Sequence, residues 1–176
     1  MRLKDKVAII TGGSRGIGFA TADAFLREGA KVAVAASSEK NAEAAVEKLK
    51  AIHPDAEVVG ISPNLGSFES VKEEFDKVEK QFGRIDILVN NAGVSESTPF
   101  TSYTEADFDR VIDLNVKGVF NATRAVVDGM IKNHSGVVLN TSSMVSISGQ
   151  PSGFAYPASK FAVNGTTISL ARELGP

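Results

Sequence analysis

Residues 7–18 read VAIITGGSRGIG, and this stretch decides the fold. Its first four residues form a short apolar run, which is typical of a strand buried in a parallel sheet. Gly12, Gly16 and Gly18 follow, and they allow the backbone to turn sharply into a helix. Such a turn also lets a phosphate approach the free N–H groups of the helix, although a tight turn without a ligand needs the same glycines. The spacing is neither G-x-G-x-x-G nor that of a P-loop.

The rest of the chain repeats this strand-to-helix unit. We predict further strands at 31–35, 57–61, 85–89 and 137–139, and helices at about 16–28, 40–52, 67–82, 104–113, 116–132 and 156–174. Strands alternating with helices indicate an α/β domain with a doubly wound parallel sheet between two helical layers, of the Rossmann type. We expect a loop over residues 144–154. In the first helix we expect the inward side chains to be Ile17, Ala20, Ala24 and Phe25.

Polar motifs follow three of the predicted strands directly, at residues 11–12, 90–91 and 142–143. Ligands of open parallel sheets bind outside the carboxyl ends of the strands, where the strand order reverses. Because these ends meet at the same edge of the sheet, we expect the three motifs to form one site.

The composition excludes several classes of protein. The 176 residues suit one domain spanning 1–176, and the net charge of -2 gives no reason to expect nucleic-acid binding. No cysteine is present, which excludes disulfides and thiolate chemistry. His53 and His134 stand alone, so we predict no metal site. The early apolar run at 7–10 is too short for a signal peptide or membrane span, and we expect a cytoplasmic protein.

Tyr156 and Lys160 are four residues apart, which on a helix places both side chains on one face. A free phenol titrates near pH ~10 and is a weak acid/base at neutrality. An ammonium beside it favours the phenolate, so such a pair is a candidate general acid/base. The same spacing also occurs on ordinary solvated helices, and the pair carries weight only together with other motifs.

The motifs taken together resemble the short-chain dehydrogenase/reductase family. Residues 11–18 match its T-G-x-x-x-G-x-G loop, whereas extended sugar-nucleotide epimerases use T-G-x-x-G-x-x-G, and position 15 here is arginine. The other matching motifs, in the family's order, are Asn90-Asn91-Ala92-Gly93, Asn115, Ser143 placed 13 residues before Tyr156, and Tyr156 with Lys160. They cover nearly the whole sequence.

The resemblance implies hydride transfer between a nicotinamide cofactor and a ketone or secondary alcohol. It makes Tyr156 the acid/base, and Lys160 the residue that assists it and bonds the nicotinamide ribose. Ser143 would donate a hydrogen bond to the substrate oxygen, with its neighbour Ser142 as the alternative. Asn115 would hold a water in a proton relay or would bond the backbone at a helix bend, and the two roles are compatible.

Relatives that prefer NAD carry a carboxylate at the end of the second strand, where this chain has Ala36. Arg15, Ser37 and Ser38 would suit a 2′-phosphate, so we expect NADP(H), with NAD possible. Asn90 would line the adenosine side or tie neighbouring strands together. The residues expected to contact the cofactor are Gly12, Ser14, Arg15, Gly16, Ile17, Gly18, Ser37, Ser38, Asn64, Leu65, Asn91, Ala92, Gly93, Tyr156 and Lys160.

Two substrate classes compete within the family. The glycine loop resembles that of 3-oxoacyl-carrier-protein reductases, and stretches such as Gly118-Val119-Phe120-Asn121 resemble bacterial bile-acid hydroxysteroid dehydrogenases. The loops at 94–103 and 144–154 contain no Lys or Arg, which slightly disfavours an acidic carrier protein. A relative that binds the cofactor without turnover is the alternative to an enzyme.

Chains of this family continue beyond the helix of Tyr156 with further strands and a substrate-covering loop. We therefore expect either a fragment or a truncated member, whose sheet lacks its C-terminal strands. An unpaired edge would make the 176 residues alone poorly soluble or inactive. The family's two long helices beside the fifth strand form its main dimer contact, which implies a homodimer or homotetramer.

Overall fold

The computed structural model describes residues 1–175, so Pro176, the last residue of the predicted domain, lies outside the described part. The chain forms a five-stranded sheet in the order β3-β2-β1-β4-β5, and every neighbouring pair is parallel. The strands are β1 (Val7–Thr11), β2 (Lys31–Ala35), β3 (Val58–Ile61), β4 (Ile87–Asn90) and β5 (Val137–Asn140). The order reverses between β1 and β4, which confirms the doubly wound sheet and its switch point.

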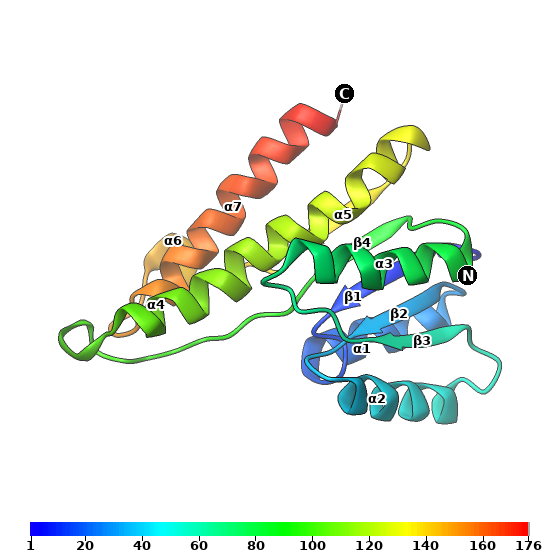
Figure 1. The fold of residues 1–176 in the computed structure, drawn as a ribbon, viewed down its shortest axis with the longest axis horizontal. Coiled ribbons are helices and arrows are strands. Elements are labelled where there is room, and N and C mark those ends of the chain that lie inside the picture. The colour runs from blue at the N-terminus through cyan, green and yellow to red at the C-terminus, as the bar shows by residue number, and fades with distance from the viewer. Residues whose placement is uncertain (176) are drawn as a thin grey trace.

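Helices cover both faces of this sheet. The helices of the chain are α1 (Gly16–Arg27), α2 (Glu39–Ile52), α3 (Phe68–Phe82), α4 (Glu105–Ile112), α5 (Gly118–Lys132), the short α6 (Val145–Ser148) and α7 (Ala155–Leu174), of which α4 and α6 lie beyond the end of the sheet (Figure 1). A 3-10 turn spans Phe100–Ser102, and a π turn at Asp113–Lys117 joins α4 to α5. Figure 1 shows α1 and α2 on one side of the sheet and α3, α5 and α7 on the other, which is the predicted three-layer arrangement.

The core consists of two apolar clusters, one on each face. Ile9 and Leu88 pack toward α3 and α5, where Phe75 is fully buried. On the opposite face, Ile10 packs with Leu49 of α2. Alternate residues of β1 therefore serve opposite layers, as expected of a strand that is buried on both sides. Within the described residues, no helix is long and apolar enough to cross a bilayer.

The predicted inward face of α1 is wrong. Ile17 is 71% exposed, and Ala20 and Ala24 are exposed as well, whereas Phe25 packs at the margin of the core. The residues that face the sheet are Gly18, Ala22 and Leu26. The reason is the turn that precedes the helix: it brings Gly18 against the backbone of Gly12, which fixes the rotation of the whole helix.

The loop expected over residues 144–154 contains α6, so this prediction is wrong for four of its residues. The sequence of this short helix has no apolar periodicity, so the pattern did not predict it. Serine side chains stabilise it instead. The Ser146 hydroxyl donates to the Ser143 carbonyl over 2.6 Å, and the Ser148 hydroxyl donates to the Met144 carbonyl over 3.2 Å. Gly149, at φ +70°, ends the helix.

Candidate active site

The glycine loop and the segment after β4 are joined by hydrogen bonds at the switch point. The Asn91 side-chain amide donates to the carbonyls of Thr11, over 3.1 Å, and of Gly12, over 3.3 Å. The Thr11 hydroxyl in turn accepts from the backbone N–H groups of Asn91 and Ala92, each over 3.0 Å. These bonds hold the two loops in fixed positions at the carboxyl ends of β1 and β4.

Gly18 is needed because two backbones meet at its position. A β-carbon there would lie 2.3 Å from the Gly12 carbonyl oxygen and 2.6 Å from the Asn91 amide nitrogen. Gly12 itself has a φ of +64°, which a side chain would strain. The loop therefore has no room for a side chain at either point.

We expect Gly18→Ala to weaken cofactor binding by about tenfold or more, because the Gly12 carbonyl must move and the loop with it. The variant should also melt at a lower temperature, although alanine is the better helix former. Titration with NADPH followed by fluorescence, and thermal melting, measure the two effects.

Gly165→Ala is the matched control, since a β-carbon at Gly165 of α7 would meet nothing within 4 Å. It should stabilise the protein or leave it unchanged, and should bind cofactor normally. Equal behaviour of the two variants would refute the role of Gly18.

A cleft of about 630 Å³ opens beside the glycine loop. Most of the residues predicted to contact the cofactor line it: Gly12, Ser14, Arg15, Gly16, Ile17, Ser37, Asn64, Leu65, Asn91, Ala92 and Gly93. Ala36 also lines it. Five further lining residues were not predicted from the sequence, and each lies next to a residue or motif already identified: Ala35, Ser62, Pro63, Val94 and Leu114.

Four of the predicted contact residues do not line the cleft: Tyr156 and Lys160, which are described below, and Gly18 and Ser38. Gly18 lies beneath the loop, as described above. Ser38 caps α2, because its hydroxyl accepts from the Asn41 N–H over 3.3 Å. The chain turns into α2 at Ser38, so of the two serines only Ser37 lines the wall of the cleft.

The start of α1 suits a dinucleotide phosphate. Its N-cap residue, Arg15, makes no side-chain cap bond, so the first N–H groups of the helix are not taken by a cap, and the Arg15 side chain is exposed. Free N–H groups and the positive end of the helix dipole favour an anion there. The residues present therefore fit a nicotinamide dinucleotide.

Asn115 lies in the π turn and is 1% exposed. Its side chain accepts from the Val94 N–H over 2.9 Å and donates to the Val94 carbonyl over 2.8 Å. It also donates to the Ser159 hydroxyl over 3.0 Å, and that hydroxyl donates to the Tyr156 carbonyl over 2.7 Å. The backbone-bonding alternative for Asn115 is thus what the structure contains, and it links the loop after β4 to α7.

Tyr156 and Lys160 both lie in the first turns of α7. Lys160 is only 6% exposed, and its ammonium lies 5.7 Å from the centroid of the Tyr156 ring. It donates to the Thr141 carbonyl over 2.7 Å. Burial lowers the pKa of Lys160. A β-carbon at Gly93 would lie 3.8 Å from this ammonium, which places the pair beside the inner end of the cleft, although neither residue lines it.

Ser142 and Ser143 follow β5 but face different partners. The Ser142 hydroxyl donates to the Lys160 carbonyl over 3.4 Å, so it is engaged with the backbone of α7. The Ser143 hydroxyl accepts from the Val145 N–H over 3.4 Å, and within residues 1–175 it has no acceptor for its own proton. Its proton is therefore free for a substrate oxygen.

Asn90 ties the sheet together and does not line the cleft. Its amide donates to the Thr123 hydroxyl over 3.1 Å and to the Asn140 side-chain oxygen over 2.9 Å. Of its two predicted roles, the structural one is thus observed, and it connects β4 to α5 and β5.

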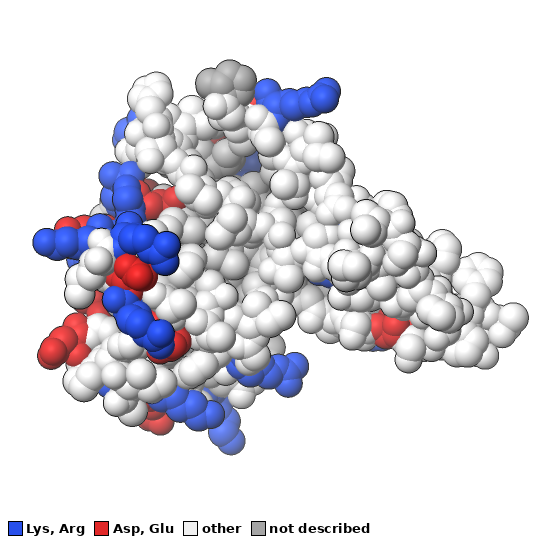
Figure 2. All heavy atoms as spheres, turned by 180° about the vertical axis from the view of Figure 1, so that it is seen from behind, with Lys and Arg blue, Asp and Glu red and all other residues white. Residues whose placement is uncertain are grey.

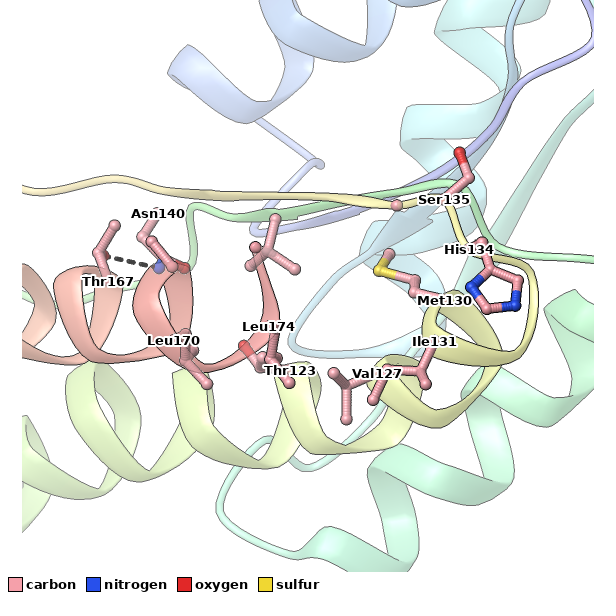
Figure 3. Close-up of a pocket in the computed structure, with 14 residues that line it drawn as sticks. Thr123, Val127, Met130, Ile131, His134, Ser135, Asn140, Thr167, Leu170 and Leu174 are labelled. Carbon is pink, nitrogen blue, oxygen red and sulfur yellow. Dashed lines mark hydrogen bonds between the residues drawn. The ribbon is translucent and has the colours of Figure 1, made fainter.

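A second hollow, of about 580 Å³, lies between α5, β5 and α7. Figure 3 shows its apolar walls, Val127 and Ile131 of α5 and Leu170 and Leu174 of α7, with the Asn140–Thr167 hydrogen bond at one end. None of the motif residues lines this hollow. It is therefore separate from the candidate active site.

Comparison with known proteins agrees with this geometry. The sequence model of the short chain dehydrogenase family matches residues 6–176. A 3alpha-hydroxysteroid dehydrogenase of Mediterraneibacter gnavus is 53% identical over 175 residues, which are 99% of this chain and 70% of that protein. A 3-oxoacyl-[acyl-carrier-protein] reductase of Thermotoga maritima is 41% identical over 174 residues, again 99% and 70% of the two chains.

Solved structures show the same fold. An NAD+-bound xylitol dehydrogenase superposes with a TM-score of 0.95 at 33% identity, covering 100% of this chain and 67% of that one. A levodione reductase also superposes with a TM-score of 0.95, at 36% identity, covering 99% and 68%. The chain therefore belongs to the short-chain dehydrogenase family, whose members use NAD(P), and it is an oxidoreductase that acts on CH–OH or C=O groups.

Proposed function

We propose that this protein transfers a hydride between NADP(H) and a ketone or secondary alcohol, with Tyr156 as the acid/base. The observation that carries the proposal is the burial of the Lys160 ammonium beside the Tyr156 ring, next to a cleft whose glycine loop suits a dinucleotide. Burying a cation costs free energy, so a lysine kept in such a place is a candidate for function.

When bound, the nicotinamide supplies the hydride chemistry. The chain's own residues manage the oxygen of the substrate. Ser143 donates a hydrogen bond to that oxygen, and Tyr156 gives it a proton as the carbonyl becomes an alcohol. Lys160 favours the phenolate left behind. Asn115, through Ser159, holds the backbone of Tyr156 in place. As part of the proposal, Asn115 also orders a water that resupplies the proton.

The cofactor preference is proposed from the wall of the cleft. Ala36 directly follows β2 and has no carboxylate to repel a 2′-phosphate, and Arg15 and Ser37 line the same cleft. An arginine and a hydroxyl are suitable partners for a phosphate.

Ala36→Asp should therefore lower the affinity for NADPH by about tenfold or more, and should raise that for NADH, because the new carboxylate repels the 2′-phosphate and accepts from a ribose hydroxyl. Arg15→Ala should weaken the binding of NADPH and leave the binding of NADH unchanged. Dissociation constants for both cofactors, measured by fluorescence titration, check this. A wild type that binds NADH more tightly than NADPH would refute the preference.

For the substrate we propose a hydroxysteroid, or the corresponding oxo-steroid. The loops at 94–103 and 144–154 carry no Lys or Arg, and they expose large apolar side chains, namely Phe100, Met144, Ile147 and Phe154. On the face that Figure 2 shows, charged side chains gather over the far end of the molecule, and few are seen over the end that holds α4 and the start of α7. Apolar surface of this kind suits a steroid better than the acidic carrier of an acyl chain.

A 3-oxoacyl thioester is the second candidate, because the reductase of Thermotoga maritima is 41% identical. The full chain with NADPH should reduce one or more oxo-steroids, and acetoacetyl thioester slowly or not at all. If the protein reduces the thioester and none of the oxo-steroids, the 3-oxoacyl thioester becomes the proposed substrate and the steroid is rejected. Tight NADPH binding without turnover of any ketone would instead identify a cofactor-binding relative that is not an enzyme.

We also propose a homodimer or homotetramer in the cytoplasm. The two long helices α5 and α7 expose Phe120, Ile131, Phe161 and Ile168, all more than half exposed, which suits burial against a second copy. Light scattering on the purified full chain tests this, and a monomer would refute it.

A further inference from the structure

The helix that carries Tyr156 lacks the usual means of stabilising its first turn. Its N-cap residue, Phe154, offers no side-chain acceptor, and no acidic residue lies in the first turn. The first N–H groups of a helix have no partner within the helix, and they bear its positive partial charge. The position of Tyr156 therefore depends on groups outside α7.

Glu96, in the loop after β4, supplies what the helix lacks. One oxygen of its half-buried carboxylate accepts from the Tyr156 N–H over 3.4 Å. The other accepts from the Thr98 N–H over 3.0 Å, which holds the carboxylate in this orientation. An acceptor and a negative charge at a helix N-terminus are both favourable.

The backbone around Glu96 is fastened to the segment that enters α7. The Gln150 side-chain amide donates to the carbonyls of Glu96 and Gly153, each over 3.0 Å. The Gly153 N–H donates to the Thr98 carbonyl over 3.0 Å. A β-carbon at Gly153 would lie 2.3 Å from the Glu96 carbonyl oxygen, so the two segments are in direct contact.

We propose that Glu96 is a positioning residue for the catalytic tyrosine. Glu96 acts by holding the first turn of α7. In this way the loop after β4, which lies next to the cleft, fixes the position of the Tyr156 phenol. This inference rests on the proposed role of Tyr156. Glu96 contacts the backbone of that residue and belongs to none of the motifs that identified the family.

In the full chain, Glu96→Ala should lower kcat by about tenfold, because the phenol is no longer held in the reacting geometry. The dissociation constant of NADPH should change by less than about twofold, since Glu96 does not line the cleft. Hydrogen exchange in a peptide covering residues 154–160 should become faster. Glu96→Gln keeps an acceptor for the Tyr156 N–H, and should recover most of the lost activity and protection.

Glu105→Ala is the matched control. Like Glu96, Glu105 places a carboxylate near the N-terminus of a helix, in this case α4, and it is exposed. Its removal leaves α4 with the capping box formed by Thr104 and Asp107. This variant should change neither kcat nor exchange at 154–160.

Equal kcat and exchange in Glu96→Ala and Glu105→Ala would overturn the inference. So would a loss of kcat without faster exchange at 154–160, because Glu96 would then act on the substrate directly. If Glu96→Ala does not fold, a folded Glu96→Gln that is as inactive as a Tyr156 variant also overturns it. A wild type without turnover of any ketone refutes the proposed function instead, and the exchange comparison still decides whether Glu96 holds α7.

Discussion

Replacing Tyr156 by phenylalanine is expected to lower kcat by about 10²–10⁴-fold, which is the usual contribution of a positioned general acid/base. The ring, its packing and its distance from the Lys160 ammonium are kept, and only the proton is lost. NADPH should bind with an affinity within about twofold of wild type, because Tyr156 does not line the cleft. Steady-state rates with the ketone that the wild type reduces fastest, and a fluorescence titration, measure both.

The chain offers a matched control in Tyr103, its only other tyrosine. The Tyr103 hydroxyl is buried and, within the described residues, makes no hydrogen bond of good geometry. Burial, followed by the Glu96 carboxylate beside it, raises the pKa of Tyr103, so it remains a neutral phenol near pH ~7. Tyr103→Phe leaves the Tyr156 proton in place but removes a hydroxyl beside Glu96, so kcat should fall by no more than about tenfold, and a loss as large as that of Tyr156→Phe would contradict the assignment.

Lys160→Met should also remove most of the activity, by about 10²-fold or more, because no cation then favours the phenolate. The same variant reports on stability. Burial lowers the pKa of Lys160 from its ordinary 10.5, which means that the unfolded chain holds this proton more tightly than the folded one. The charged lysine therefore costs stability below the lowered pKa, and the cost disappears as pH rises through it toward 10.5.

Melting curves from about pH 7 to about pH 10 should thus show wild type gaining stability relative to Lys160→Met as pH rises. Lys48→Met is the control, because Lys48 is exposed on α2 and its curve should run parallel to that of wild type. Parallel curves for Lys160→Met as well would mean that the buried ammonium costs the fold nothing.

Much of this fold is readable from local pattern. The apolar run at 7–10 and the helical spacing of Val71, Phe75 and Val78 predict elements that the structure contains, because each is buried by simple periodicity. The rotation of α1 was mispredicted, since it is set by the contact of Gly18 with Gly12 and Asn91, and Asn91 is far along the chain. The short α6 was missed because serine side chains, rather than apolar spacing, stabilise it.

The candidate site was predictable where residue types and spacing carry the chemistry. The glycine loop and residues 91–93 line the cleft, as expected. Glu96 could not be found in this way, because its role depends on a tertiary contact. Nothing in the sequence around Glu96 indicates that the folded chain places its carboxylate at the N-terminus of α7. The position of Ser38 has a related explanation: its hydroxyl caps α2 and does not line the cleft, and that role depends on where α2 begins.

The most direct test of the central claim is the fate of the hydride. NADPH deuterated at both C4 positions should be incubated with the full chain and a panel of oxo-steroids, and the alcohol analysed by mass spectrometry. The account predicts an alcohol that carries a deuterium on the former carbonyl carbon, formed by wild type and nearly absent with Tyr156→Phe. An alcohol without label, or equal labelled product from both proteins, would contradict hydride transfer assisted by Tyr156.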